Sequence, residues 1–143
     1  MGEQEERKDV RIPCMFRTMW PDGARPRVGT DRDVLGARVP ADVNLVEAAR
    51  VRPGKGMSVF RSIQQMPPFL IPKDYLARFP EAGGKRGKTI WRLGTEGFAN
   101  GPVTDDLVLR AGSAHGALEP AREMPLDAYQ AALAATRDGW VPV

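Results

Sequence analysis

The chain has 143 residues with one cysteine, one histidine and a formal net charge of +3, so it is long enough for one domain that buries about 70% of its unfolded surface. A single cysteine excludes an intrachain disulfide, and no second cysteine or histidine is available for a zinc site. Because there is no run of about 18 apolar residues and no apolar N-terminal segment, we expect a cytoplasmic protein without a membrane span or a metal.

The cations are mostly arginines, and they are spread along the chain instead of forming one block. A nucleic-acid-binding domain usually concentrates its Lys and Arg residues on one face, so this spread argues only weakly for a nucleic-acid partner. It suits small phosphate-bearing molecules equally well, because the planar guanidinium makes bidentate contacts with phosphate.

Thirteen prolines and fifteen glycines divide the chain into short elements. Residues 1–12 are highly charged and are expected to form a disordered tail ahead of a single domain over residues 13–143. The apolar residues of 14–20, which end at the turn Pro21-Asp22-Gly23, predict a buried strand. We expect a weaker strand over 34–39, then a polar loop over 40–56 with one helical turn at 45–50.

The second half of the chain contains the clearest patterns. A strand is predicted over 57–63, and Pro67-Pro68 prevents it from continuing further. A short helix is predicted over 72–79, with Pro72 in its first turn. Alternating apolar residues predict strands over 89–93, 106–110 and 116–121. Helical spacing of Leu126, Tyr129, Ala132 and Leu133 predicts a closing helix with Gly139 as its stop. The predicted fold class is therefore α+β.

Two motifs are set aside. The segment Ala82-Gly-Gly-Lys-Arg-Gly-Lys-Thr89 differs by one residue from a phosphate-binding P-loop, but Thr89 begins a predicted strand, whereas a P-loop opens a helix. Cys14 and His115 could in principle form a thiol nucleophile and its base. A small apolar strand residue is the commoner role for a lone cysteine.

Four polar residues lie on or beside three separate predicted strands: Arg17, Ser58, and the pair His115 and Glu119. Arg17 is flanked by Met15, Phe16, Met19 and Trp20, so a simple surface role would require its strand to expose one cation from an apolar stretch. Each of the four also has an ordinary structural interpretation, such as a solvated strand end for Glu119. Their spread over several strands is typical of a cleft enzyme, in which separate strands present side chains to one site.

Three features of the sequence occur in a characteristic order and spacing. They are Phe16-Arg17, the segment Gly54-Lys-Gly-Met-Ser-Val-Phe60, and His115 followed by Glu119-Pro-Ala121 and the predicted helix over 124–133. In these features the chain resembles the small ADP-ribosyltransferase-like toxins that type VI secretion delivers in Pseudomonas, and their stand-alone relatives. The resemblance covers residues 14–140. It implies a split, strongly bent pair of β-sheets with peripheral helices and with NAD bound in the cleft between the sheets.

The resemblance also implies roles for particular residues. Arg17, Thr18, Ser58 and Phe60 would bind NAD, and Ser58, His115 and Glu119 would be catalytic, with Glu123 as an alternative to Glu119. A carboxylate would stabilise the oxocarbenium-like transition state of nicotinamide–ribose cleavage, and Arg17 would bind a phosphate. The chain differs from the best-marked toxins because it lacks a Ser-Thr-Ser run and an acid-x-acid pair, and it carries His115 instead.

A toxin of this kind would modify a target macromolecule inside the cell it enters, and it would be held inactive by a cognate immunity or antitoxin protein. It would reach its target by a route that needs no signal peptide. Two other functions stay open from the residues alone: a metal-independent ribonuclease toxin that uses His115 with Arg17 and Ser58, and a non-catalytic binding module.

Overall fold

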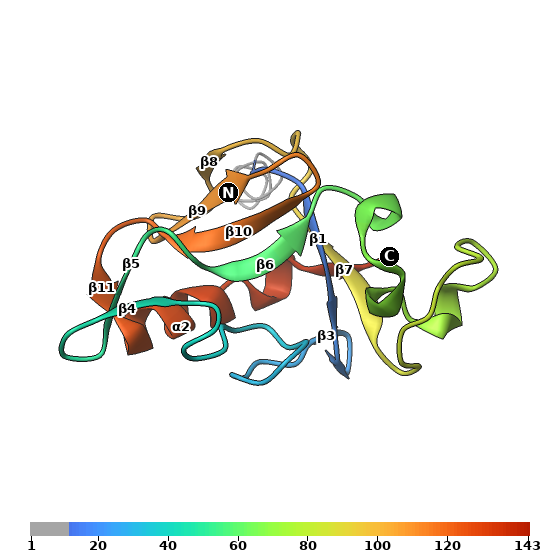
Figure 1. Cartoon of the computed structure of the whole chain (residues 1–143), viewed down its shortest axis with the longest axis horizontal. Helices are drawn as coiled ribbons and strands as arrows, with labels where there is room; N and C mark the ends of the chain where they lie inside the picture. Colours follow the sequence, from blue (N-terminus) through green and yellow to red (C-terminus); the bar gives the residue numbers. More distant parts are fainter. Residues whose placement is uncertain (1–11) are drawn as a thin grey trace, which may run out of the picture.

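A computed structural model describes residues 12–143, so most of the predicted N-terminal tail lies outside the described residues. The fold is α+β and rich in strands, and its main sheet curls into a half-barrel (Figure 1). Seven antiparallel strands form this sheet in the order β12-β7-β1-β6-β10-β9-β8. Their bounds are β1 Met15–Met19, β6 Met57–Phe60, β7 Thr89–Leu93, β8 Gly101–Pro102, β9 Leu107–Ala111, β10 His115–Pro120 and β12 Val141–Pro142.

Smaller elements surround this sheet. A three-stranded sheet lies to the left of β6 in Figure 1, and helix α2 and a two-stranded hairpin lie below β6; three short 3-10 helices lie in the connection between β6 and β7. These elements are β2 Pro21–Asp22, β3 Arg25–Pro26, β4 Asn44–Val46, β5 Arg50–Arg52, β11 Met124–Pro125, α2 Leu126–Ala134, η1 Ile63–Gln65, η2 Pro68–Leu70, η3 Lys73–Tyr75 and η4 Arg137–Gly139.

The strongest sequence patterns are confirmed. The predicted strands at 14–20, 57–63, 89–93, 106–110 and 116–121 correspond to β1, β6, β7, β9 and β10, and the C-terminal helix is α2. The helix ends at Ala134, and a 3-10 turn completes the segment to Gly139. Of the helix predicted over 72–79, only the 3-10 turn Lys73–Tyr75 forms.

Two predictions for the first half of the chain are wrong. Residues 34–39 form no strand apart from an isolated bridge between Leu35 and Val28, because this segment curls around the side chain of Arg17 and the carbonyl of Val34 accepts two hydrogen bonds from that side chain. Residues 45–50 form no helical turn. They close the β4–β5 hairpin, in which Ala48 and Ala49 take positive φ values and β5 pairs with β11.

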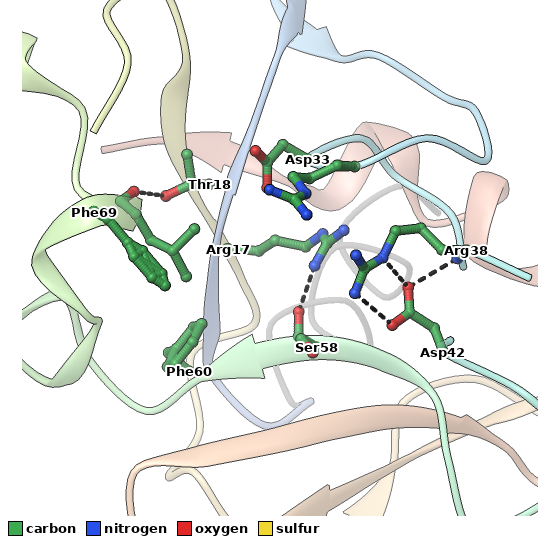
Figure 2. A pocket seen from close by; sticks show the side chains of 10 residues that line it. Arg17, Thr18, Asp33, Arg38, Asp42, Ser58, Phe60 and Phe69 are labelled. Carbon is green, nitrogen blue, oxygen red and sulfur yellow. Dashed lines mark hydrogen bonds and ion pairs between the residues drawn. The ribbon is translucent and has the colours of Figure 1, made fainter. Parts of the chain in front are cut away.

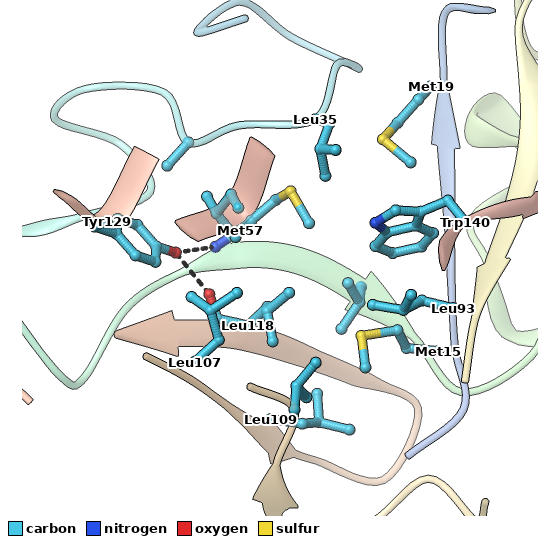
Figure 3. Close-up of a cluster of buried hydrophobic side chains, with 14 of the residues drawn as sticks. Met15, Met19, Leu35, Met57, Leu93, Leu107, Leu109, Leu118, Tyr129 and Trp140 are labelled. Atoms are coloured by element: carbon cyan, nitrogen blue, oxygen red, sulfur yellow. Dashed lines mark hydrogen bonds between the residues drawn. The ribbon is translucent and has the colours of Figure 1, made fainter. Parts of the chain in front are cut away.

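The main core lies between the concave face of the curled sheet and helix α2 (Figure 3). Alternate residues of the strands supply it, including Met15, Met57 and Leu118, and the helix contributes Tyr129 and Leu133. A second, smaller core of Ile63, Met66, Ile71, Ala82 and Ile90 holds the β6–β7 connection against the opposite face of the sheet.

Tyr129 joins the helix to two neighbouring strands inside the main core. Its hydroxyl donates to the carbonyl of Leu118 on β10 at 2.6 Å and accepts from the backbone N–H of Met57 on β6 at 3.1 Å. Burial raises the pKa of this phenol, so it remains a neutral donor at any ordinary pH. The side chain therefore satisfies two backbone groups that lie at the point where β6 begins.

We predict that Tyr129→Phe lowers the free energy of unfolding by about 1–3 kcal/mol, because it leaves a buried N–H and a buried carbonyl without this partner. Tyr75→Phe is the matched control, since the Tyr75 hydroxyl also joins two backbone groups, at Ile90 and Val143, but in a more exposed setting. Urea unfolding of the three proteins measures the difference. Equal losses for the two variants would contradict a special role for Tyr129.

Candidate functional site

Arg17 lies where the main sheet divides. Strands β1 and β6 share a single register pair, Phe16 with Phe60, and β6 then turns away from β1 (Figure 1). The Arg17 side chain extends into the opening, where its Nη1 donates to the carbonyl of Ser58 on β6 at 2.7 Å. Its Nε and Nη2 donate to the carbonyl of Val34 at 3.3 and 2.9 Å. The guanidinium thus joins two strands and a loop through backbone oxygens alone.

The loop that carries Val34 is held in place by a close contact between two glycines. A Cβ atom on Gly36 would lie 1.7 Å from the carbonyl oxygen of Gly29, and Gly36 has a φ of +156°. Residue 36 must therefore be glycine for the loop to close. Gln130 of α2 secures the next residue, because its side-chain amide accepts from the N–H of Ala37 and donates to its carbonyl.

A cavity of about 270 Å³ opens beside Arg17 (Figure 2). Arginines and carboxylates line one side, and aromatic rings line the other. The ten lining residues are Arg17, Thr18, Arg32, Asp33, Arg38, Asp42, Ser58, Phe60, Phe69 and Leu70.

The cavity has a positive electrostatic character because both of its carboxylates already have cationic partners. Asp33 accepts from Lys88 Nζ at 2.5 Å, and Asp42 accepts from Arg38 Nε at 3.1 Å and from Arg38 Nη2 at 3.2 Å. Arg17 and Arg32 form no ion pair with any described residue. Two cations of the wall are therefore available to an anionic ligand.

Arg17 keeps its charge at neutral pH and retains unused donors. Burial lowers the pKa of Arg17 to about 10, while the charges of Asp33 and Asp42 act in the opposite direction. A guanidinium has five N–H donors, and the three bonds described above leave one N–H on each terminal nitrogen without a partner in residues 12–143. These donors can bind the oxygens of a phosphate or carboxylate.

The fold brings together the four residues assigned to cofactor binding from the sequence. Arg17, Thr18, Ser58 and Phe60 all line the cavity. The hydroxyl of Thr18 donates to the carbonyl of Leu70 at 2.6 Å, so it fixes the cavity wall. The hydroxyl of Ser58 has no hydrogen-bond partner among residues 12–143 and is free to contact a ligand.

His115 lies next to the cavity, although it is not one of the residues that line it. It opens β10 and pairs with Phe60, and the two rings meet edge to face with their centroids 5.2 Å apart. The imidazole is exposed to solvent. His115 therefore contacts Phe60, a residue of the cavity wall, but does not line the cavity itself.

The two candidate carboxylates lie elsewhere. Glu119 is 1% exposed, and it accepts from the backbone N–H of Gly54 at 3.0 Å and from Arg110 Nε at 3.1 Å. It projects from the same face of β10 as Ala117, the register partner of Ser58, but does not line the cavity. Glu123 forms a surface ion pair with Arg50 at 3.0 Å.

Six residues of the cavity were not predicted from the sequence: Arg32, Asp33, Arg38, Asp42, Phe69 and Leu70. All belong to loops or 3-10 turns, where no periodic pattern distinguishes an inward side chain from a solvated one. The spacing of Arg38 and Asp42 was the one available signal, because a turn that bonds Asp42 N–H to the Arg38 carbonyl brings the opposite charges together.

The other candidate sites give less support for a function. The glycine-rich segment 82–89 is a loop that leads into strand β7, in agreement with its rejection as a P-loop. Within residues 12–143 there is no group of three His, Cys, Asp or Glu residues placed to hold a metal ion. The described part of the chain also has no helix long and apolar enough to cross a membrane.

Comparison with family models, with curated proteins and with solved structures finds no match to this chain. The case for its function therefore rests on the residues of the cavity and on the chemistry they permit.

We predict that pyrophosphate stabilises the protein at neutral pH and that this effect declines as the pH rises through about 10, where Arg17 loses its proton. A ligand that binds only the native state adds about 2.7 kcal/mol at about a hundredfold excess over its dissociation constant. Thermal unfolding with and without pyrophosphate measures the shift in Tm. Arg17→Gln should remove it, and Arg122→Gln, a surface change outside the cavity, should leave it intact.

Proposed function

We propose that the cavity binds NAD and that the protein is an ADP-ribosyltransferase-like toxin. The observation that carries the proposal is the charged Arg17 guanidinium, with two unused N–H donors, at the split between β1 and β6. Support also comes from the strong curl of the main sheet and from the shared position of Arg17 and Ser58 at one cavity, although the seven strands form one continuous sheet and not the separate pair that the resemblance implies.

The residues present suit a dinucleotide with a diphosphate and flat rings. Arg17 and Arg32 offer cationic donors on one side of the cavity, and Phe60 and Phe69 offer rings on the other. The cavity volume of about 270 Å³ is near the lower end of the range for small-molecule sites, so it suits part of the dinucleotide. NAD supplies an activated N-glycosidic bond, with nicotinamide as the leaving group.

We assign roles to Arg17, Ser58 and Glu119 from where each side chain lies. Arg17 binds a phosphate and remains fixed by the carbonyls of Val34 and Ser58. The free hydroxyl of Ser58 orients the ribose beside it. Glu119 projects from the same sheet face as Ser58, and its carboxylate is held by Gly54 and by the largely exposed Arg110. Because Glu119 is buried and does not line the cavity, the role that we assign to it is a long-range one: its negative charge favours the positive charge that develops on the ribose without touching it.

We predict that the purified protein releases nicotinamide from NAD, and that Ser58→Ala reduces this rate by about tenfold to a hundredfold because a positioned hydrogen bond is lost. Ser62→Ala is the matched control, since Ser62 follows the same strand but lies outside the cavity. Arg17→Lys should also reduce the rate, because an ammonium keeps the charge and loses the planar pair of donors.

Unfolding measurements separate chemistry from structure in this series. Ser58→Ala should keep its Tm, whereas Glu119→Ala should lose both activity and stability, because the N–H of Gly54 loses its acceptor. RNA degradation by the wild type without NAD would instead favour a ribonuclease, and a full rate of nicotinamide release in Ser58→Ala would refute the proposed cleft.

The proposal also includes an inhibitory protein partner, as the resemblance implies. Because the cavity is basic, we expect that partner to present acidic side chains to it and to gain association rate from charge complementarity. Expression of this chain alone should stop growth, and co-expression of the product of the neighbouring open reading frame should restore it. The two proteins should co-purify, and their binding should weaken as salt rises. Normal growth on expression alone would contradict a toxin.

A further inference from the structure

The connection between β6 and β7, residues 61–88, forms a lobe beside the main sheet (Figure 1). This β6–β7 lobe has six Lys and Arg residues and two acidic residues, a net charge of +4. The whole chain has a net charge of +3, so the rest of the protein is close to neutral. The cations that seem scattered along the sequence are therefore unevenly distributed in the fold.

Most of these cations are free to bind an external anion. Arg61, Lys73, Arg78 and Lys85 are exposed and form no ion pair with any residue in 12–143. Only two of the six have acidic partners: Arg86 lies 3.5 Å from Asp74, and Lys88 binds Asp33.

Aromatic rings accompany the cations. The guanidinium of Arg78 lies over the rings of Tyr75 and Phe79, at 5.1 and 5.7 Å from their centroids. A depression of about 390 Å³ runs between Tyr75, Arg78 and Lys88. Beyond it, Lys88 and Arg27 lie over the ring of Trp20, at 5.3 and 5.9 Å. Two groups of basic side chains and rings thus lie at the depression, which Arg78 and Lys88 both line.

The lobe is attached to the candidate cleft at two points. Near its beginning, Leu70 accepts from Thr18 and lines the cavity together with Phe69, which is 61% exposed. At its end, Lys88 binds Asp33, another residue of the cavity wall. A molecule bound along the lobe would therefore meet the cavity at its rim.

We infer that the β6–β7 lobe binds single-stranded nucleic acid and presents it to the cleft as the acceptor of ADP-ribose. Unpaired cations contact phosphates, and exposed rings such as Phe69 stack on unpaired bases, a combination that an acidic protein surface would not require. This inference rests on the proposed function. In the reaction, an oxygen or nitrogen of the acceptor forms a bond to C1′ of the ribose, nicotinamide leaves with the electron pair of the broken C–N bond, and the acceptor's proton passes to water.

Binding is tested first without NAD, by fluorescence anisotropy of a labelled single-stranded oligoribonucleotide, its deoxy counterpart and the duplex. Arg78→Gln with Lys85→Gln should weaken single-strand binding by about tenfold to thirtyfold near 0.1 M salt and lower the slope of log K against log salt by about 1.4. Arg52→Gln with Lys55→Gln is the matched control, because these exposed residues lie outside the lobe and their loss changes the charge equally.

Phe69→Leu tests stacking while it keeps an apolar side chain, and it should weaken single-strand binding by about fivefold or more. Equal effects of the lobe and control pairs, preference for the duplex, or equal competition by polyglutamate would overturn the inference. Preference between the RNA and DNA strands identifies which of the two is the acceptor.

Transfer is tested by incubating the oligonucleotide with NAD and measuring a mass gain of one ADP-ribose. The lobe pair should reduce transfer and leave nicotinamide release in the absence of oligonucleotide unchanged. If nicotinamide is released but no oligonucleotide gains mass, the acceptor assignment is wrong and the proposed function stands. If NAD is not turned over at all, the proposed function fails, and the acceptor inference fails with it even where the anisotropy shows lobe binding.

Discussion

The structure depends on one half-buried cation that has no carboxylate partner of its own. Arg17 donates only to the carbonyls of Val34 and Ser58, so it ties together a strand edge and a loop whose backbone oxygens would otherwise face each other across the split sheet. A charge in such a place is costly unless hydrogen bonds satisfy it. The bonds to these carbonyls meet part of that cost and leave positive charge directed at the cavity, which is a poor arrangement for stability and a good one for binding an anion.

The surrounding charges make this arrangement tolerable. Asp33 and Asp42 stand near Arg17 without bonding to it, and each is engaged by another cation, Lys88 or Arg38. Their fields help to keep the guanidinium protonated, while their oxygens are occupied and do not block its free donors. The site is thus prepared for a ligand before the ligand arrives, which reduces the reorganisation that binding would require.

The sequence was informative where periodicity and burial coincide. Strand β7 could be placed because Thr89–Leu93 is a short apolar run with one internal charge, and Arg17 stood out because its neighbours are apolar. Arg32 and Phe69 could not be foreseen, since they reach the cavity from an irregular loop and a 3-10 turn whose paths are set by distant contacts. The buried position of Glu119 could not be foreseen for the same reason, because its partner Gly54 is 65 residues away in sequence. The uneven charge of the lobe was equally hidden, because only the fold shows which arginines share a surface.

The double attachment of the lobe has a thermodynamic consequence. Thr18 and Asp33 are shared between the cavity wall and the segment that ends in Leu70 and Lys88, so a ligand that shifts either residue changes the free energy of the other region. Such coupling is necessarily reciprocal: whatever factor an occupied cavity contributes to affinity at the lobe, an occupied lobe returns to the cavity. Two weak binding events can therefore act as one selective event, in which neither small molecule nor macromolecule is held firmly until both are present.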